Sequence, residues 1–321
     1  MGDEIELLHW GILGFIGNLS FHVGREDPNG PHHTLVGVAS SRSRDVAKEF
    51  LESFDVLECT LTFRDYSELV RSNLIDVVFV ATPRSHHFQN ALLALEAGDH
   101  VVCQTSRQTC RLLRDGEIGQ VNCIVANFGI RDNYCMFGSV SDRLTSKELA
   151  DGALLELGSL ALHWILRALP GGACRPIQVT STMKKMSRIS VDETTTIDMV
   201  FSTGGPPDGQ LAHMIIEGPN GKIEIRGWEA IPTELYLFKN SYNLSKPYDV
   251  TFHEEEPLFV PEADEVARCI REGLLESPEM PWAESLLVME IMDFVRKQND
   301  LQYPPEIEAS EPSVRLPSRP L

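Results

Sequence analysis

The clearest pattern of hydrophobic positions lies in the first third of the chain. Residues 76–80 form a short β-branched and aromatic run without polar alternation, which is typical of a strand buried on both faces. Apolar residues then recur at helical spacing until Gly98, and a second strand is predicted at 100–103. Strand, helix and strand in this order predict a right-handed parallel crossover, whose ligands bind beyond the carboxyl ends of the strands. The residues at those two ends are Ala81, Thr82 and Pro83, and Gln104, Thr105 and Ser106.

A first strand is predicted at 7–13, directly before a glycine-containing turn. Gly14 and Gly17 stand where a dinucleotide site needs residues without side chains, so that backbone amides can approach a pyrophosphate. The match to the pattern Gly-x-Gly-x-x-Gly is imperfect, because Ile16 occupies the place of the second glycine. The turn is therefore interpreted either as a nucleotide-binding loop or as an ordinary tight turn.

The second strand, predicted at 35–39, ends in a serine-rich and basic turn. In such folds this strand end contacts the adenosine ribose, and an acidic residue there favours a free 2′-hydroxyl. Here Ser41 and Arg42 suit a 2′-phosphate instead, so NADP is predicted in preference to NAD. The alternative is that Arg42 is only a solvated loop charge.

From Ile177 onward the periodicity changes to that of successive strands with short links. Asn220 and Gly221 form a two-residue hairpin signal between two of them, which indicates an antiparallel sheet. Helices are predicted at 262–272 and 282–298. The expected fold class is thus α/β plus α+β, with an N-terminal Rossmann dinucleotide-binding domain and a C-terminal open antiparallel sheet. We expect the domains at residues 1–110 and 111–305, followed by a loose tail at 306–321.

Composition restricts the partners of the protein. A net charge of −19 over 321 residues argues against binding to nucleic acid or to an anionic membrane. No apolar stretch reaches the length of a membrane span, and acidic residues near the N-terminus are unlike a signal peptide, so a cytoplasmic location is expected. The seven cysteines form no C-x-x-C pair and no His/Cys cluster, which predicts reduced thiols and no metal site.

Several motifs resemble those of one oxidoreductase family. The chain is similar to the glucose-fructose oxidoreductase, inositol dehydrogenase and MocA (Gfo/Idh/MocA) family, and within it to the dihydrodiol dehydrogenase and NADP-dependent D-xylose dehydrogenase group. The motifs that carry the resemblance are Ala81-Thr82-Pro83 with His87, the segments 92–98, 152–158, 191–194, 218–221, 232–235 and 262–265, and Glu276-Ser-Pro-Glu-Met-Pro-Trp282. The resemblance implies a substrate site between the two domains, a polyol or sugar substrate, and a homodimer through the C-terminal sheet. It also implies that Thr82, Pro83, His87 and Gln104 contact the cofactor.

The chain departs from this family at the residues that carry out the chemistry. The family's Glu-Lys-Pro triplet is replaced by Gln104, Thr105 and Ser106, and its tyrosine position is Leu160. Threonine cannot replace an ammonium group, and leucine has no proton to donate. The remaining acid/base candidates are Glu156, where the family usually has aspartate, and His163, two helical turns further on. Each also has a structural interpretation, as a capping or paired residue.

A second departure follows Ser106, where the family has a further helix and strand of roughly 30 residues. Three functions therefore stay open. The first is an NADP-dependent oxidoreductase that acts on a vicinal diol or sugar hydroxyl, with impaired activity. The second is a catalytically silent dinucleotide-binding regulatory or interaction protein. The third is a truncated gene product. A lysine placed by the fold near the strand ends would favour the enzyme, and the residues to inspect are Lys147, Lys184 and Lys185.

Overall fold

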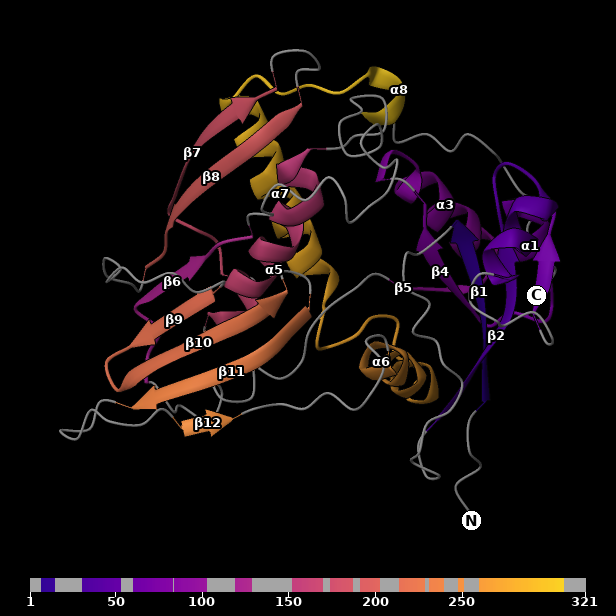
Figure 1. The fold of residues 1–321 in the computed structure, drawn as a ribbon, viewed down its shortest axis with the longest axis horizontal. Coiled ribbons are helices and arrows are strands. Elements are labelled where there is room, and N and C mark those ends of the chain that lie inside the picture. Colours follow the sequence, from indigo (N-terminus) through magenta and orange to yellow (C-terminus); the bar gives the residue numbers. More distant parts are fainter. Residues whose placement is uncertain are drawn as a thin grey trace.

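The computed structural model describes residues 7–14, 31–52, 60–82, 84–102, 119–128, 152–169, 174–186, 191–202, 214–228, 231–239, 248–250 and 260–308. These residues form two sheets with separate cores and a third, two-stranded sheet (Figure 1). None of the described helices has both the length and the apolar composition needed to cross a bilayer.

The first domain is built on a five-stranded parallel sheet with the order β3-β2-β1-β4-β5. Its strands are β1 (Leu7–Gly14), β2 (His32–Ala39), β3 (Leu61–Phe63), β4 (Val77–Ala81) and β5 (His100–Val102). This is the strand order of a Rossmann sheet, as predicted, and β5 is the last strand of the described sheet. The described helices between its strands are α1 (Arg44–Glu52), α2 (Tyr66–Val70) and α3 (Arg84–Ala97).

Strand β4 shows why the sheet needs helices on both faces. Val77 and Phe79 face the cluster that includes residues of α1, whereas Val78 and Val80 face the cluster that includes residues of α2 and α3. Successive residues of a strand point to opposite faces, so an uninterrupted apolar run requires two covering layers. Gly98, with φ of +89°, ends α3 in a left-handed conformation, as the sequence predicted.

The second domain contains the antiparallel sheet β12-β11-β10-β9-β6 and the strand pair β7-β8. Its strands are β6 (Cys123–Ala126), β7 (Gln178–Lys185), β8 (Asp192–Val200), β9 (Met214–Gly218), β10 (Gly221–Trp228), β11 (Ile231–Lys239) and β12 (Tyr248–Val250). The predicted hairpin at Asn220 and Gly221 joins β9 to β10. The fold class that the sequence indicated is thus confirmed for both domains.

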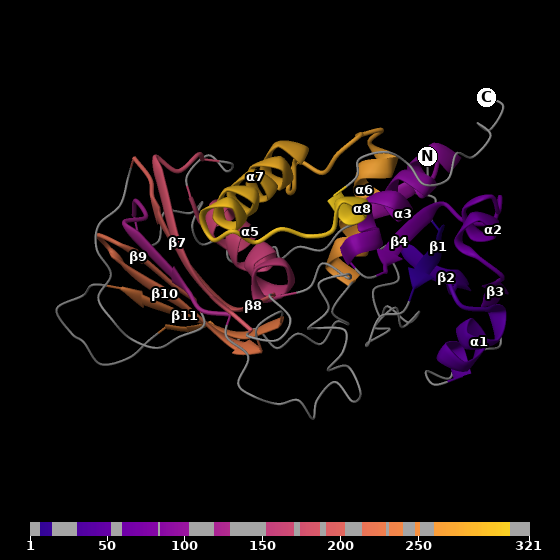
Figure 2. The same ribbon diagram turned by 90° about the horizontal axis from the view of Figure 1, so that it is seen from above.

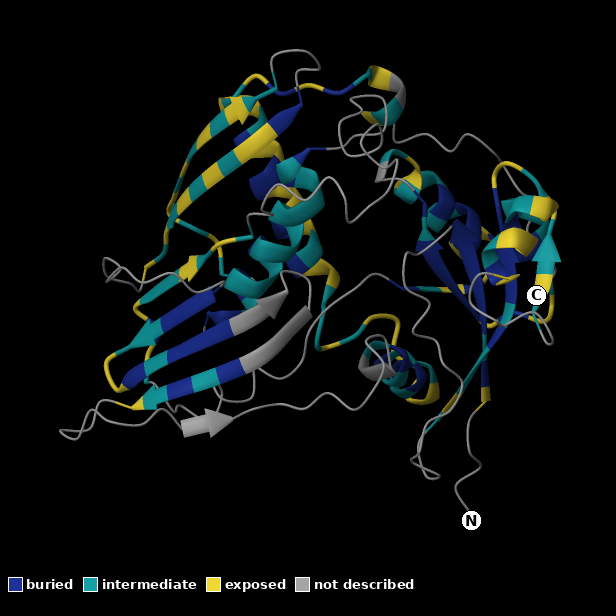
Figure 3. Cartoon of the chain, in the orientation of Figure 1, coloured by how far each residue is buried: buried dark blue, intermediate teal, exposed yellow. Residues whose placement is uncertain are grey.

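Two helices cover one face of this antiparallel sheet and form its core. They are α5 (Ser159–Ala168), which continues the π-helical turn η3 (Leu154–Gly158), and α7 (Trp282–Gln298). Ile216, Ile223 and Leu237 of the sheet pack in the same cluster as Leu162 and Leu166 of α5. Figures 1 and 2 place α5 and α7 between the antiparallel sheet and the first domain. In Figure 3, buried residues concentrate on the parallel strands, on the first half of β9 and on parts of β10 and β11.

The remaining two helices contact the first domain although they follow the antiparallel sheet in the chain. Ala263 and Ala267 of α6 (Val260–Arg271) belong to the core cluster on one face of the parallel sheet. On the same helix Asp264 bonds His33 of β2 at 3.1 Å between Oδ1 and Nε2. The short helix α8 (Pro305–Glu308) contacts α3. The domain boundaries expected from the sequence stay a prediction.

Candidate functional site

The carboxyl end of β1 packs closely against the carboxyl end of β4. Gly14 pairs with Ala81 and has φ of +92°. A Cβ atom at this position would lie 2.7 Å from the carbonyl oxygen of Ala81 and 3.1 Å from the amide nitrogen of Thr82. Both the backbone conformation and the available space therefore require glycine here, as in the first turn of a dinucleotide-binding domain. The second predicted glycine, Gly17, lies outside the described residues.

The turn after β2 presents Arg42 to solvent. The buried side chain of Ser40 accepts a hydrogen bond from the backbone N–H of Arg42 at 3.2 Å, which holds the turn. Ser41 and Arg42 are both exposed, and within the described chain the Arg42 guanidinium has no hydrogen bond or ion pair. By contrast, Arg44 bonds Glu68 at 3.3 Å. Of these two arginines, Arg42 is thus the one available to an anionic ligand.

The end of β4 is fixed by two side chains of α3. Thr82 is 3% exposed, and its Oγ1 accepts a hydrogen bond from Nδ2 of Asn90 at 3.0 Å. The carbonyl oxygen of Thr82 lies 2.6 Å from Nε2 of His87. Because a carbonyl oxygen can only accept, His87 donates from Nε2 and braces the turn. Pro83 and Gln104, which the sequence also assigned to the cofactor, lie outside the described residues, as does Thr105.

Asn90 was not predicted from the sequence. It is the second of two adjacent amides, Gln89 and Asn90, directly before the apolar half of α3, and it is 8% exposed. Such a buried amide needs a partner, and only the fold shows that this partner is Thr82.

The acid/base candidates lie in the second domain, on η3 and α5. Glu156 is part of the π-helical turn, and His163 follows in α5. Because an i→i+5 turn holds one more residue than an α-helical turn, the seven-residue spacing between them is not two α-helical turns. Leu160, which the resemblance assigns to the position of the family's tyrosine, lies between them in α5.

His163 is held in one tautomer by its own helix. Its Nδ1 lies 2.7 Å from the carbonyl oxygen of Ser159, so Nδ1 carries the proton and Nε2 keeps a free lone pair in the neutral ring. Burial lowers the pKa of His163, and the charge of Arg167 adds to this effect, while the bond to Ser159 opposes it. The imidazole is therefore neutral near pH 7.

The start of this helical segment depends on Asp192, which is 1% exposed. Its Oδ2 accepts hydrogen bonds from the backbone N–H of Leu154 at 2.6 Å and from Oγ1 of Thr195 at 2.7 Å. A Cβ atom at Gly152 would lie 2.1 Å from Oδ1 of the same carboxylate, so only glycine fits. Two of the motifs quoted above, 152–158 and 191–194, thus pack against each other and fix the turn that carries Glu156.

Two of the lysines proposed as substitutes for the missing ammonium are bound elsewhere. Nζ of Lys184 pairs with Glu193 at 2.8 Å, and Nζ of Lys185 bonds the carbonyl oxygen of Asp300 at 2.9 Å. Both lie on β7, which Figure 1 places on the far side of α5 and α7 from β4. Lys147 lies outside the described residues.

Within the described residues no three His, Cys, Asp or Glu side chains gather as metal ligands. A Rossmann sheet whose first turn holds a glycine close to the neighbouring strand, joined to an antiparallel-sheet domain, is the architecture of the two-domain dinucleotide-binding proteins. Comparison with known proteins shows which family of that architecture the chain resembles.

Residues 8–104 match the family described as oxidoreductase family, NAD-binding Rossmann fold (GFO_IDH_MocA). The D-xylose 1-dehydrogenase (NADP(+)) of Hypocrea jecorina is 29% identical over 365 positions, covering 92% of this chain and 93% of that protein. The trans-1,2-dihydrobenzene-1,2-diol dehydrogenase of Danio rerio is 26% identical, covering 92% and 98%. The resemblance to the Gfo/Idh/MocA oxidoreductase family, and within it to these two kinds of dehydrogenase, is thereby confirmed.

Solved structures show the same fold. The aldose-aldose oxidoreductase from Caulobacter crescentus complexed with glycerol superposes with a TM-score of 0.67 at 19% identity, covering 91% of this chain and 97% of that one. The biliverdin reductase of Synechocystis, solved with biliverdin and NADP+, has a TM-score of 0.58 at 17% identity, covering 91% and 99%. At these identities the likeness concerns the fold alone.

Proposed function

We propose that the chain is an NADP-dependent oxidoreductase that transfers a hydride between NADP and a hydroxyl-bearing carbon of a vicinal diol or sugar, of the dihydrodiol or D-xylose type. The observation that carries this proposal is Gly14, which lies so close to β4 that a Cβ atom would meet the backbone of Ala81 and Thr82. Only glycine lets the chain leave β1 in so tight a turn, which is the part played by the first glycine of a dinucleotide-binding pattern, so this residue fits the cofactor.

The preference for the 2′-phosphate rests on Arg42. It is exposed at the carboxyl end of β2, the strand end that contacts the adenosine ribose in this fold, and no described acidic side chain pairs with it. The NADP dependence of the Hypocrea relative supports the same assignment. A guanidinium binds a phosphate through charge-assisted hydrogen bonds.

Bound NADP would supply the hydride acceptor. The chain's own residues would take the hydroxyl proton of the substrate. His163 is suited to this, because its Nδ1–H is bonded to Ser159 and its lowered pKa leaves Nε2 unprotonated near neutral pH. The carboxylate of Glu156 is the other candidate base. Gln104 would bond a ribose hydroxyl through its amide.

The test is equilibrium binding followed by NADPH fluorescence, with a matched pair of arginine variants. We expect the protein to bind NADPH more tightly than NADH, and Arg42→Ala to weaken NADPH binding about tenfold, the loss of one phosphate ion pair, without changing NADH binding. Arg44→Ala, which removes a neighbouring arginine bonded to Glu68, is the control and should leave both affinities unchanged. A folded protein that binds neither nucleotide would refute the proposed function.

A second candidate function is a catalytically silent dinucleotide-binding protein. Leu160 at the tyrosine position and the engagement of Lys184 and Lys185 with other partners favour it. The alignment with the Hypocrea relative also extends over 365 positions, more than the 321 residues of this chain, so that protein has residues without a counterpart here. NADPH binding without turnover of pentoses or dihydrodiols would identify this function. A chain without a cooperative unfolding transition would instead indicate a truncated gene product.

We further propose a homodimer through the face of the antiparallel sheet opposite to α5 and α7. The strand register places Glu217, Lys222 and Phe238 in one row on that face. Nζ of Lys222 lies 4.9 Å above the Phe238 ring and 2.7 Å from Oε1 of Glu224. Sedimentation velocity should give the mass of two chains, and a monomer at micromolar concentration would refute the dimer.

A further inference from the structure

The motif Glu276-Ser-Pro-Glu-Met-Pro-Trp282 lies between α6 and α7, and its own hydrogen bonds hold it in a fixed turn. A carboxylate oxygen of Glu276 accepts from the backbone N–H of Trp282, the first residue of α7, at 2.5 Å. The backbone N–H of Met280 bonds the carbonyl oxygen of Ser277 at 3.0 Å. These residues, 276–282, are called the connecting segment below.

One end of the connecting segment is bonded to the first domain through α6. The hydroxyl of Ser277 donates to Oε1 of Glu265 at 2.5 Å. Glu265 is 8% exposed and also accepts both forked N–H groups of Arg268, at 2.9 and 2.7 Å. Helix α6 is itself fixed to the parallel sheet by Ala263, Ala267 and the bond between Asp264 and His33. Ser277 is therefore attached to a rigid part of the first domain.

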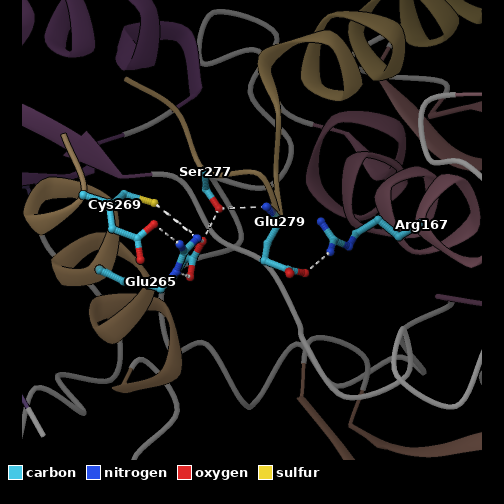
Figure 4. Close-up of polar contacts among 7 residues, drawn as sticks. Arg167, Glu265, Cys269, Ser277 and Glu279 are labelled. Atoms are coloured by element: carbon cyan, nitrogen blue, oxygen red, sulfur yellow. Dashed lines mark hydrogen bonds and ion pairs between the residues drawn. The ribbon is translucent and has the colours of Figure 1, made fainter. Parts of the chain in front are cut away.

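The other end is bonded to α5 in the second domain. The hydroxyl oxygen of Ser277 accepts the backbone N–H of Glu279 at 3.1 Å, and Oε2 of Glu279 accepts from Nη2 of Arg167 at 3.0 Å. The side chain of Arg167 is only 10% exposed and that of Glu279 30% exposed. Figure 4 shows these groups as one continuous row from α6 to α5. Arg167 lies one helical turn beyond His163 on α5.

We propose that the connecting segment sets the position of α5 relative to the first domain, with Ser277 and Glu279 as positioning residues for the acid/base groups on η3 and α5. The part of this inference that concerns catalysis rests on the proposed function. The geometric part does not, because it follows from bonds that join α6 to α5 in the chain itself.

The connecting segment is not alone in joining the two domains. Besides the connecting segment, α8 contacts α3. Figure 1 shows α8 near the top of the view and α6 well below it. Without the bonds of Ser277 and Glu279, α6 is joined to the second domain at this place by the peptide chain alone, and the second domain can turn relative to the first, since relative domain motion is the ordinary behaviour of a polar interdomain contact. Displacing a reacting group by about 1 Å can cost on the order of a hundredfold in rate.

The geometric test measures the distance between the domains in the full chain without cofactor. Nitroxide labels attached through p-acetylphenylalanine at Glu96 of α3 and Asp198 of β8, both exposed, avoid the native cysteines. We expect one narrow distance distribution for the parent protein. In the double variant Ser277→Ala, Glu279→Gln the distance distribution should be about twice as wide, because these bonds no longer fix the angle between the two domains. Glu290→Gln is the control, since it removes a comparable but exposed ion pair with Arg175 within the second domain.

The catalytic test compares kcat with nucleotide affinity in the same variants, counting active protein by NADPH binding stoichiometry. We expect kcat to fall about ten- to a hundredfold in the double variant while the Kd for NADPH stays within about twofold, because the nucleotide loop lies wholly in the first domain. A distance distribution as narrow as that of the parent overturns the inference outright. A broadened distribution with unchanged kcat overturns the positioning role. If the parent protein binds no NADPH, the proposed function fails, and the distance measurement still decides the geometric part.

Discussion

Gly14 and Gly98 form a natural pair for testing whether the first turn is a nucleotide-binding turn. Their φ angles are nearly equal, at +92° and +89°. A Cβ atom at Gly14 would lie 2.7 Å from the carbonyl oxygen of Ala81, whereas a Cβ atom at Gly98 meets nothing within 4 Å. Alanine at either position carries the left-handed strain of about 1–2 kcal/mol. Only Gly14→Ala adds the cost of overpacking, about 1–3 kcal/mol.

The two alanine variants should therefore differ in stability by about 2 kcal/mol, which corresponds to on the order of 10 °C in Tm for a first domain of about 110 residues that unfolds by itself. Their nucleotide affinities should differ as well. Gly14 stands at the carboxyl end of β1, where the ligand of a parallel sheet binds. Gly98 directly precedes β5 and so lies at the amino ends of the strands, away from that site. We expect Gly14→Ala to weaken NADPH binding at least about tenfold, through displacement of the turn, and Gly98→Ala to leave it unchanged.

Calorimetry and NADPH fluorescence titration on the two variants and the parent protein measure both effects. If Gly14→Ala matches Gly98→Ala in Tm, the close contact with Ala81 is wrong. If it is less stable but binds NADPH with the affinity of the parent, the turn is tight for packing reasons alone, and the assignment of a cofactor site to it fails.

Three further predictions concern the second domain. Asp192→Ala should lower the free energy of unfolding by about 2–5 kcal/mol in urea titrations, because the N–H of Leu154 and the hydroxyl of Thr195 lose their buried acceptor; a loss under about 1 kcal/mol would contradict this. Burial raises the pKa of Glu284, so the folded protein keeps that proton to higher pH than the unfolded chain and loses stability as the carboxyl ionises. Glu284→Gln should thus raise Tm at pH 7 and have little effect near pH 4, and an equal gain at both pH values would argue against a buried ionised group. The ring of His163 should titrate in NMR spectra below the pKa of an unstructured histidine, because burial disfavours its charged form, and a higher midpoint would show that the ring is solvated or paired with an acid.

The elements that the sequence predicted well are long or strongly bounded. Helix α7 was predicted at the residues where it occurs, because Pro281 precedes it and apolar residues repeat along 17 positions. The crossover from β4 through α3 to β5 was also correct. Strands β3 and β12 have three residues each, too few for a periodic pattern, and were missed, whereas the equally short β5 was predicted from its place directly after the helix that ends at Gly98.

Some residues of the candidate site could be predicted from the sequence and others could not. Gly14 and Thr82 could be predicted because a parallel strand ends directly before each turn. Two hydrogen bonds could not be predicted: the one from Asn90 to Thr82, and the one from the backbone N–H of Leu154 to Asp192. Both join residues that only the fold brings together. The same holds for Ser277, whose motif was noted for its resemblance to a family and not for a contact.

Helix α6 has a consequence for how the protein is made. Its alanines complete a core that begins with Leu8 and Trp10, so about 250 residues of chain separate the two halves of one packed face. During translation the parallel sheet and α1 leave the ribosome long before α6, so the part of the apolar face that α6 covers stays exposed through synthesis of the entire antiparallel sheet. Nascent chains stalled before residue 260 should therefore be captured by chaperones through the N-terminal sheet, whereas those stalled beyond residue 300 should be released.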